Sequence, residues 1–196
     1  MKTLTHPLLI LIRGLPGSGK TYIAKDLRKK LEKQFGDSST VMLDPDATDY
    51  TSQAYADHVV EQTKDGVDPI LHPYRFLRAQ AYDAITSDKI ILWNQPFTSL
   101  DSFQKVTTRL QEYATEHSKE LPMLVVEVEV NPTVAKQRVD ERKQAGGHGP
   151  SDKTFTRFTN EFASFAEHGF NTLTVNGEDN VDTSNEKITT AMQELV

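Results

Sequence analysis

The chain has 196 residues, of which 37% are hydrophobic and 26% charged, a composition that fits one soluble domain with a full hydrophobic core. Its 28 acidic and 22 basic residues give a formal net charge of −6, which argues against nucleic acid as the main partner, because neutralising phosphates needs a basic surface. The absence of cysteine excludes disulfides and thiol nucleophiles, and since we see no secretory signal and no apolar run long enough to span a bilayer, we expect a cytoplasmic protein.

The first half of the chain alternates apolar runs of strand length with segments of helical period. In chain order it predicts a strand at 8–13, a helix at 21–33, a strand at 41–43, helices at 55–64 and 73–86, and a strand at 89–93. Pro73 suits the first turn of its helix. Such alternation is typical of an α/β fold with a mostly parallel sheet.

The second half continues this alternation. Thr98 and Asp101 have capping-box spacing and are expected to start a helix, which a strand at 123–130 follows. Asn131-Pro132 then cap a helix, and a glycine-rich loop comes at 146–150. The remaining elements are an expected helix with a buried stripe of Phe155, Phe158, Phe162 and Phe165 that ends at Gly169, a strand at 170–175, and a terminal helix opened by Thr183 and Glu186.

We find no internal repeat and no linker in this pattern. Residues 1–196 are therefore expected to form a single domain, with a small lid at about 138–157.

The segment Gly-Leu-Pro-Gly-Ser-Gly-Lys-Thr at 14–21 matches the pattern G-x-x-x-x-G-K-[ST] in full, between a predicted strand and a predicted helix. The glycines let successive backbone N–H groups converge on an anion, and the helix N-terminus adds partial positive charge. Lys20 can reach the β- and γ-phosphates, and the Thr21 hydroxyl can bind Mg²⁺. We predict that ATP and Mg²⁺ bind here, with Thr21 as the metal ligand and as nucleotide-binding residues Gly14, Pro16, Gly17, Ser18, Gly19, Lys20 and Thr21.

Two carboxylates, Asp44 and Asp46, follow the second predicted strand. Ligands of open α/β sheets bind beyond the carboxyl ends of the strands, where a carboxylate can accept the proton of an attacking hydroxyl or help to hold Mg²⁺. The alternative is that both aspartates merely cap a turn beside Pro45. Their spacing does not decide between the two roles.

Two arginines, Arg138 and Arg142, lie four residues apart just before the glycine-rich loop. They fit a lid whose guanidinium groups neutralise a transferring phosphoryl group. The alternative is a solvated helix face in which they pair with Asp140 and Glu141. Arg78 raises a similar choice, because it can bind an anionic acceptor or simply be an exposed helical arginine.

Several of these features together resemble the zeta-toxin and polynucleotide-kinase group of P-loop kinases. They are the Pro-Gly-Ser-Gly-Lys-Thr core, the Asp-x-Asp after the second strand, and the series Arg138, Arg142, Gly146-Gly147-His148, Pro150 and Arg157. The resemblance, which runs over about residues 8–158, implies a five-stranded sheet of order 2-3-1-4-5 with helices on both faces. It also implies transfer of the ATP γ-phosphate to a hydroxyl, with Asp46 as general base and Arg138 and Arg142 as lid arginines.

The chain departs from that group after the third strand, where many such kinases carry an acid. Asn94 begins an Asn-Gln-Pro segment here, so that any binding role falls to an amide. Glu127 and Glu129 share one face of the fourth predicted strand, and we expect that face to be partly exposed.

We therefore predict an ATP-dependent phosphotransferase that acts on a hydroxyl of a small molecule or nucleotide-type acceptor. Its catalytic residues would be Lys20, Asp46 and Arg142, and its acceptor-side residues Asp44, Asp46, Arg78 and Asn94. Two alternatives stay open: a nucleotide-binding switch without an acceptor, and a toxin kinase with an antitoxin partner. A GTPase is disfavoured because the chain lacks an Asn-Lys-x-Asp sequence.

Overall fold

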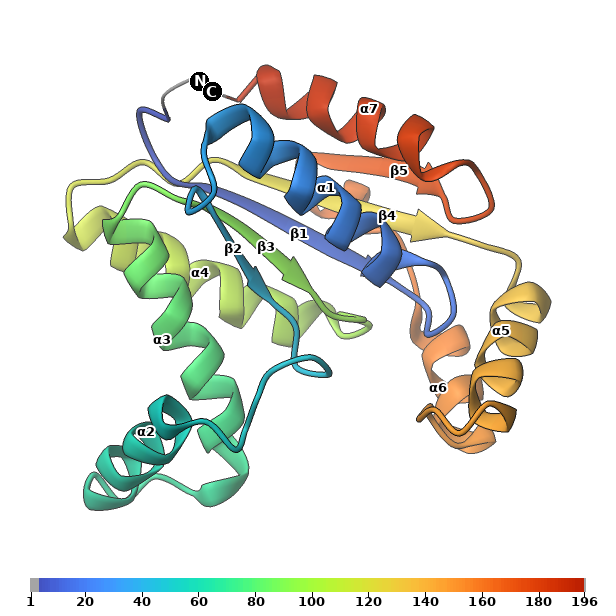
Figure 1. The fold of residues 1–196 in the computed structure, drawn as a ribbon, viewed down its shortest axis with the longest axis horizontal. Helices are drawn as coiled ribbons and strands as arrows, with labels where there is room; N and C mark the ends of the chain where they lie inside the picture. The colour runs from blue at the N-terminus through green and yellow to red at the C-terminus, as the bar shows by residue number, and fades with distance from the viewer. Residues whose placement is uncertain (1–3, 196) are drawn as a thin grey trace.

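A five-stranded parallel sheet forms the centre of the computed structural model, which describes residues 4–195 (Figure 1). Its strands are β1 (Leu8–Gly14), β2 (Thr40–Leu43), β3 (Ile90–Asn94), β4 (Met123–Glu129) and β5 (Thr172–Asn176). They are ordered β2-β3-β1-β4-β5, and each neighbouring pair is parallel. The predicted strand order and fold class are therefore confirmed.

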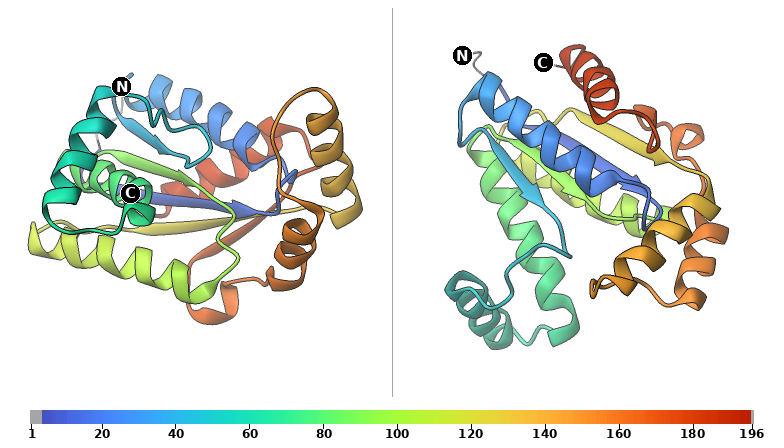
Figure 2. Two further views of the ribbon diagram at one scale, coloured as in Figure 1. Left: turned by 90° about the horizontal axis from the view of Figure 1, so that it is seen from below. Right: turned by 45° about the vertical axis from the view of Figure 1, so that its right-hand side comes forward.

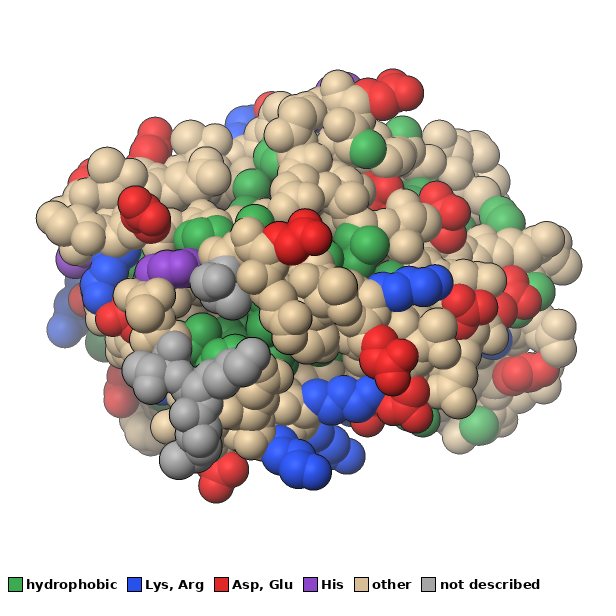
Figure 3. Space-filling model, turned by 90° about the horizontal axis from the view of Figure 1, so that it is seen from above, with side chains coloured by type: hydrophobic (Ala, Val, Ile, Leu, Met, Phe, Trp, Pro, Cys, Tyr) green, Lys and Arg blue, Asp and Glu red, His purple; other side chains and the backbone are tan. Residues whose placement is uncertain are grey.

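Helices cover both faces of this sheet. The helices of the described residues are α1 (Lys20–Phe35), α2 (Gln53–Lys64), α3 (His72–Thr86), α4 (Leu100–Glu116), α5 (Pro132–Gln144), α6 (Asp152–Glu161) and α7 (Val181–Gln193), with short 3₁₀ turns at Pro69–Leu71 and Ala166–His168. Helices α1 and α7 pack on one face, and α3 and α4 on the other (Figure 1). Figure 3 shows the face formed by α1 and α7, on which acidic and basic side chains are interspersed.

The side chains of the central strand β1 enter two hydrophobic cores, one on each face of the sheet. Its residues Leu8 to Ile12 are fully buried, because both faces of a parallel sheet are covered by helices. Side chains alternate along a strand, so Leu8, Ile10 and Ile12 join the core under α1 and α7. Leu9 and Leu11 join the core under α3 and α4.

Two projections extend beyond the carboxyl ends of the strands (Figures 1 and 2). Helices α5 and α6 form the first, and α2 with the first turns of α3 forms the second. A small third core of Leu15, Ala135, Val139 and Phe155 attaches α5 and α6 to the loop after β1. The sheet thus opens, at its carboxyl edge, into a region flanked by two helical arms.

Three local expectations were wrong. Helix α4 is capped by Ser99 and α7 by Asn180, each through a side-chain bond to a backbone N–H, so the predicted capping boxes were displaced by one and three residues. The four phenylalanines do not share a helix, because α6 ends at Glu161. Phe165 lies beyond it, in the core under α3 and α4.

The expected exposed face of β4 is also wrong in part. Glu129 is exposed, but Glu127 is buried. Its carboxylate is paired with Arg13 of the neighbouring strand and accepts a hydrogen bond from the backbone N–H of Phe165. The ion pair lets a charged residue occupy an interior position.

Candidate active site

The loop between β1 and α1 forms a backbone cradle at the N-terminus of α1. Gly17 has a φ of +85°, and a Cβ there would lie 2.2 Å from the carbonyl oxygen of Ala135 in α5. Only glycine therefore permits this close approach between the loop and α5. The hydroxyl of Ser18 is buried against Gly14, behind this loop, and has no hydrogen-bond partner in the described part of the chain.

Lys20 begins α1, and its ammonium group lies inside the cradle. Its Nζ donates to the carbonyl oxygen of Leu15 at 3.2 Å. Burial lowers the pKa of Lys20 to about 8, and the nearby carboxylates of Asp46 and Asp44 oppose that shift. The guanidinium of Arg142 lowers the pKa further. Lys20 and Arg142 thus place two cationic side chains close together beside the cradle, where a phosphate group would neutralise them.

A chain of hydrogen bonds connects Thr21, Asn94 and Asp44. The amide Nδ2 of Asn94 donates to Thr21 Oγ1 at 2.9 Å and to Asp44 Oδ2 at 2.6 Å. Asp44 and Asn94 are 5% and 2% exposed, and Asn94 Oδ1 has no partner in the described residues. The amide that replaces the expected acid is thus positioned beside the hydroxyl predicted to bind Mg²⁺.

The two aspartates have different surroundings. Asp44 Oδ1 accepts a hydrogen bond from the backbone N–H of Asp46 at 2.9 Å, so Asp44 closes a turn as well as contacting Asn94. Asp46 is exposed, and its carboxylate accepts no hydrogen bond from the described residues. The carboxylate of Asp44 is therefore occupied by hydrogen bonds within the site, whereas the carboxylate of Asp46 is available to a bound substrate.

One cleft of about 530 Å³ brings most of the predicted residues together. Those that line it are Pro16, Gly17, Gly19, Lys20, Thr21, Asp44, Asp46, Asn94, Arg138 and Arg142. Gly14 and Ser18 are buried behind the cradle surface. Arg78 does not line the cleft; it lies on α3 near Arg75 and Arg109, where burial lowers its pKa.

Both arginines that were predicted to belong to a lid lie on α5 and line this cleft. Arg138 Nη1 donates to the carbonyl oxygens of Gly177 at 3.0 Å and Gly17 at 3.4 Å, whereas Arg142 is exposed. The alternative pairing with acidic neighbours is not formed, because Asp140 pairs with Lys136 and Glu141 accepts from Gln137. Arg142 is therefore available to a ligand.

Sequence reasoning missed Arg13, the last residue before the cradle. Its Nε donates to the carbonyl oxygen of Phe97 at 3.1 Å, and its Nη1 donates to Glu127 and to the carbonyl oxygen of Ala163. Its guanidinium lies over the rings of Phe162 and Phe165, at 4.2 and 3.6 Å from their centres. Arg13 thereby joins β1 to the segment that follows α6. The one available signal was a charged residue at the end of an apolar strand.

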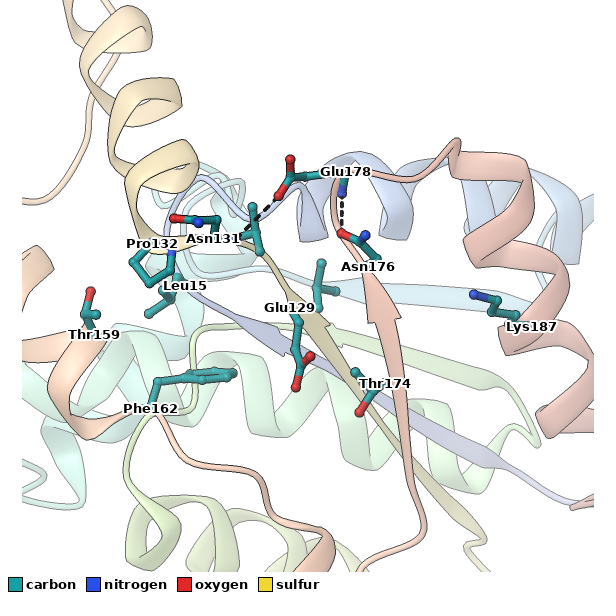
Figure 4. Close-up of a pocket in the computed structure, with 12 residues that line it drawn as sticks. Leu15, Glu129, Asn131, Pro132, Thr159, Phe162, Thr174, Asn176, Glu178 and Lys187 are labelled. Carbon is teal, nitrogen blue, oxygen red and sulfur yellow. Dashed lines mark hydrogen bonds between the residues drawn. The ribbon is translucent and has the colours of Figure 1, made fainter.

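A second hollow, of about 630 Å³, lies beyond the ends of β4 and β5. Figure 4 shows Glu129 pointing between Phe162 and Thr174, with Glu178 bonded to Asn131 above. This hollow contains a free carboxylate from the strand and none of the predicted site residues. It therefore does not have the chemistry of a phosphate site.

The residues present fit a bound nucleotide and a metal held mainly by its phosphates. The described residues contain no cluster of three or more His, Asp or Glu side chains that would hold a metal by itself. The Thr21 hydroxyl, with the unpartnered Asn94 Oδ1 nearby, suits a hard cation such as Mg²⁺, which prefers oxygen ligands.

Among the described helices, none is long and apolar enough to cross a membrane.

A protein-family model described as AAA domain matches residues 9–168. The chain belongs to this AAA domain family. A curated relative, the thymidylate kinase of Leptospira borgpetersenii serovar Hardjo-bovis (strain L550), is 24% identical over 146 residues, which cover 70% of this chain and 71% of the relative.

Two solved structures extend the comparison. A gluconokinase from Sinorhizobium meliloti 1021 has a TM-score of 0.57 at 11% identity, with 99% of this chain and 95% of that chain covered. Kti12 from Chaetomium thermophilum, in complex with ADP-AlF3, has a TM-score of 0.59 at 19% identity, with 93% and 98% covered. At these identities the likeness establishes the fold, which is that of P-loop kinases.

Proposed function

We propose that this AAA domain protein is an ATP-dependent kinase that transfers the γ-phosphoryl group of ATP to a hydroxyl group of a small molecule. The observation that carries the proposal is the arrangement of charge in one cleft. Lys20 and Arg142 supply positive charge beside the phosphate cradle, and the free carboxylate of Asp46 lines the same cleft. A free carboxylate at this place can accept the proton of an attacking hydroxyl group.

In this mechanism the acceptor oxygen forms a bond to the γ-phosphorus, and the bond from that phosphorus to the β–γ bridging oxygen breaks. ADP leaves with the electron pair of the broken bond, and the hydroxyl proton passes to Asp46. Lys20 and Arg142 stabilise the charge on the phosphoryl oxygens. Asp44 and Asn94 hold the Thr21 hydroxyl in place. Mg²⁺, when bound, neutralises charge on the β- and γ-phosphates.

The lid supports a place in the zeta-toxin and polynucleotide-kinase-like group within this proposal. Arg138 and Arg142 lie on one helix over the cradle, as that resemblance implies. Two of the similar proteins, a thymidylate kinase and a gluconokinase, agree with phosphotransfer but indicate different acceptors.

Asp46→Asn tests the proposal. We expect the variant to lose transfer by about 10²-fold or more, in line with removal of a general base, while its affinity for ATP stays within a few-fold of the wild type. Transfer would be measured with γ-labelled ATP, Mg²⁺ and a pooled metabolite extract. Asp49→Asn is the matched control, because Asp49 lies on the same loop but does not line the cleft.

Two results would contradict the proposal. The first is slow release of phosphate with no labelled product, unchanged in Asp46→Asn, which would identify a nucleotide switch. The second is loss of ATP binding in Asp46→Asn, which would assign Asp46 to the nucleotide and not to the acceptor.

A further inference from the structure

The positive charges of the cleft all come from the cradle and the lid. Lys20 lies at the start of α1, and Arg138 and Arg142 lie on α5. The β2–α2 loop and α3 contribute a different set of lining residues: Asp44, Pro45, Asp46 and Tyr74. An acceptor bound between these two sets is therefore close to cationic side chains only on the side that faces the γ-phosphate of ATP.

The β2–α2 loop is acidic throughout. Residues 44–52 contain three aspartates and no lysine, arginine or histidine. Asp49 accepts hydrogen bonds from the backbone N–H and hydroxyl of Thr51, at 2.8 and 2.6 Å, and Asp44 is bonded to Asn94. Asp46 is the free carboxylate. A phosphate group on the acceptor would lie against carboxylates of like charge, on a loop that has no cationic side chain to neutralise it.

The nearest arginines do not correct this imbalance. Arg75 Nη1 donates to Gln62 Oε1 at 3.0 Å, within the α2–α3 arm, and Arg78 does not line the cleft. Lys25, Arg28 and Lys29 of α1 line a separate hollow of about 600 Å³, which shares only Asp44 with the cleft.

Aromatic side chains complete the acceptor wall. Tyr74 lines the cleft and is 56% exposed. Tyr50 lies on the acidic loop, and its ring centre is 4.9 Å from that of Tyr55, which in turn is 5.2 Å from Phe76. Burial raises the pKa of Tyr50, and Tyr74 and Asp46 are close enough to raise it further. A tyrosine exposed beside a polar cleft offers a ring for stacking and a hydroxyl for hydrogen bonding.

From this wall we infer that the acceptor is a phosphate-free, ring-bearing alcohol, such as a nucleoside or a sugar, and not a phosphorylated compound. The inference rests on the proposed kinase activity and deepens it. The ring stacks on Tyr74, the attacking hydroxyl meets Asp46, and the new P–O bond forms as ADP leaves with the electrons of the broken bond.

A phosphatase-treated metabolite extract tests the inference without knowledge of the acceptor. One half of a pooled extract is treated with immobilised alkaline phosphatase, the enzyme is removed, and both halves are incubated with the protein, γ-labelled ATP and Mg²⁺. We expect the treated half to give at least as much labelled product as the untreated half. Labelling that falls tenfold or more after treatment would overturn the inference and leave the kinase proposal intact.

A failure of the kinase proposal looks different. In that case neither half gives a labelled product, although the protein binds ATP, and the inference falls with the proposal.

Where a labelled product is formed, thymidine and thymidylate serve as a defined pair that differs only in a phosphate. A value of kcat/KM for thymidylate above that for thymidine would count against the inference.

Substitution of Tyr74 tests the aromatic wall once a labelled acceptor is isolated. We expect Tyr74→Ala to raise the acceptor KM about tenfold, with the ATP KM unchanged, and Tyr74→Phe to restore most of the loss. Ile70→Ala is the control, because Ile70 is 70% exposed and does not line the cleft. An unchanged acceptor KM in Tyr74→Ala would remove the stacking role.

Discussion

Two groups of charged side chains lie near the carboxyl end of β1, and their surroundings are opposite. Arg13 and Glu127 are 0% and 1% exposed and are bonded to each other and to backbone groups. Lys20, Asp46 and Arg142 line an open cleft, and the carboxylate of Asp46 has no donor among the described residues. The closed group satisfies its own charge and holds the structure together, whereas the open group leaves charge for a ligand.

The contrast predicts that the first group contributes mainly to stability and the second mainly to the proposed reaction. Arg13 joins β1, the loop at Phe97 and the segment after α6. Phe97 has a φ of +44°, a conformation that a bulky side chain rarely adopts, and its carbonyl oxygen accepts the Arg13 bond. The closed group therefore holds in place the loop that follows Asn94.

The largest expected effect is on folding, in Arg13→Met. Removing the arginine leaves the buried Glu127 carboxylate without its cation, a change that costs about 3–5 kcal/mol of unfolding free energy. Urea denaturation followed by circular dichroism would measure it. A double-mutant cycle with Glu127→Gln isolates the coupling between the two side chains. A loss below about 1 kcal/mol in Arg13→Met would show that the closed group is not a structural element.

We expect Lys20→Met to have the opposite effect, with a large loss of phosphoryl transfer and no loss of stability. We expect a loss of transfer of about 10²–10³-fold, as when one donor to the transition-state charge is removed. Because burial depresses the pKa of Lys20 in the folded protein, its charged form is disfavoured by folding below pH 8, so its removal should not reduce stability. A transfer assay with γ-labelled ATP and urea denaturation of the same variant would measure both effects. A clear loss of stability would place Lys20 with the closed group.

The smallest expected effect is on the pH dependence of ATP binding. In the free protein Lys20 loses its proton near pH 8, and bound phosphate favours the protonated form. ATP binding should therefore take up a proton above pH 8, and affinity should fall by at most about tenfold per pH unit. Calorimetry in buffers of different ionisation enthalpy would detect the uptake. Lys20→Met is the control, and uptake that persists in it would assign the proton to another group.

Much of the fold was predictable because its signals are local. The alternation of apolar runs and helical periods placed every strand of the sheet within a few residues, and the glycine-lysine pattern at 14–21 located the cradle. Helix boundaries were less accurate, as at Ser99 and Asn180, because neighbouring polar residues offer alternative caps. The prediction that four phenylalanines share one helix was wrong because the chain leaves the helix after Glu161. Phe162 and Phe165 there contact the guanidinium of Arg13, and the backbone N–H of Phe165 donates to Glu127.

By itself, the sequence determined the cradle, the strand order implied by its resemblance, and the candidate roles of Asp46 and Arg142. Only the tertiary structure showed that Asn94 links Thr21 to Asp44, that Arg78 lies outside the cleft, and that Arg13 pairs with Glu127. The physical reason is separation along the chain. Arg13 and Glu127 lie 114 residues apart, and the register between β1 and β4, which places them side by side, is set by the packing of the whole sheet.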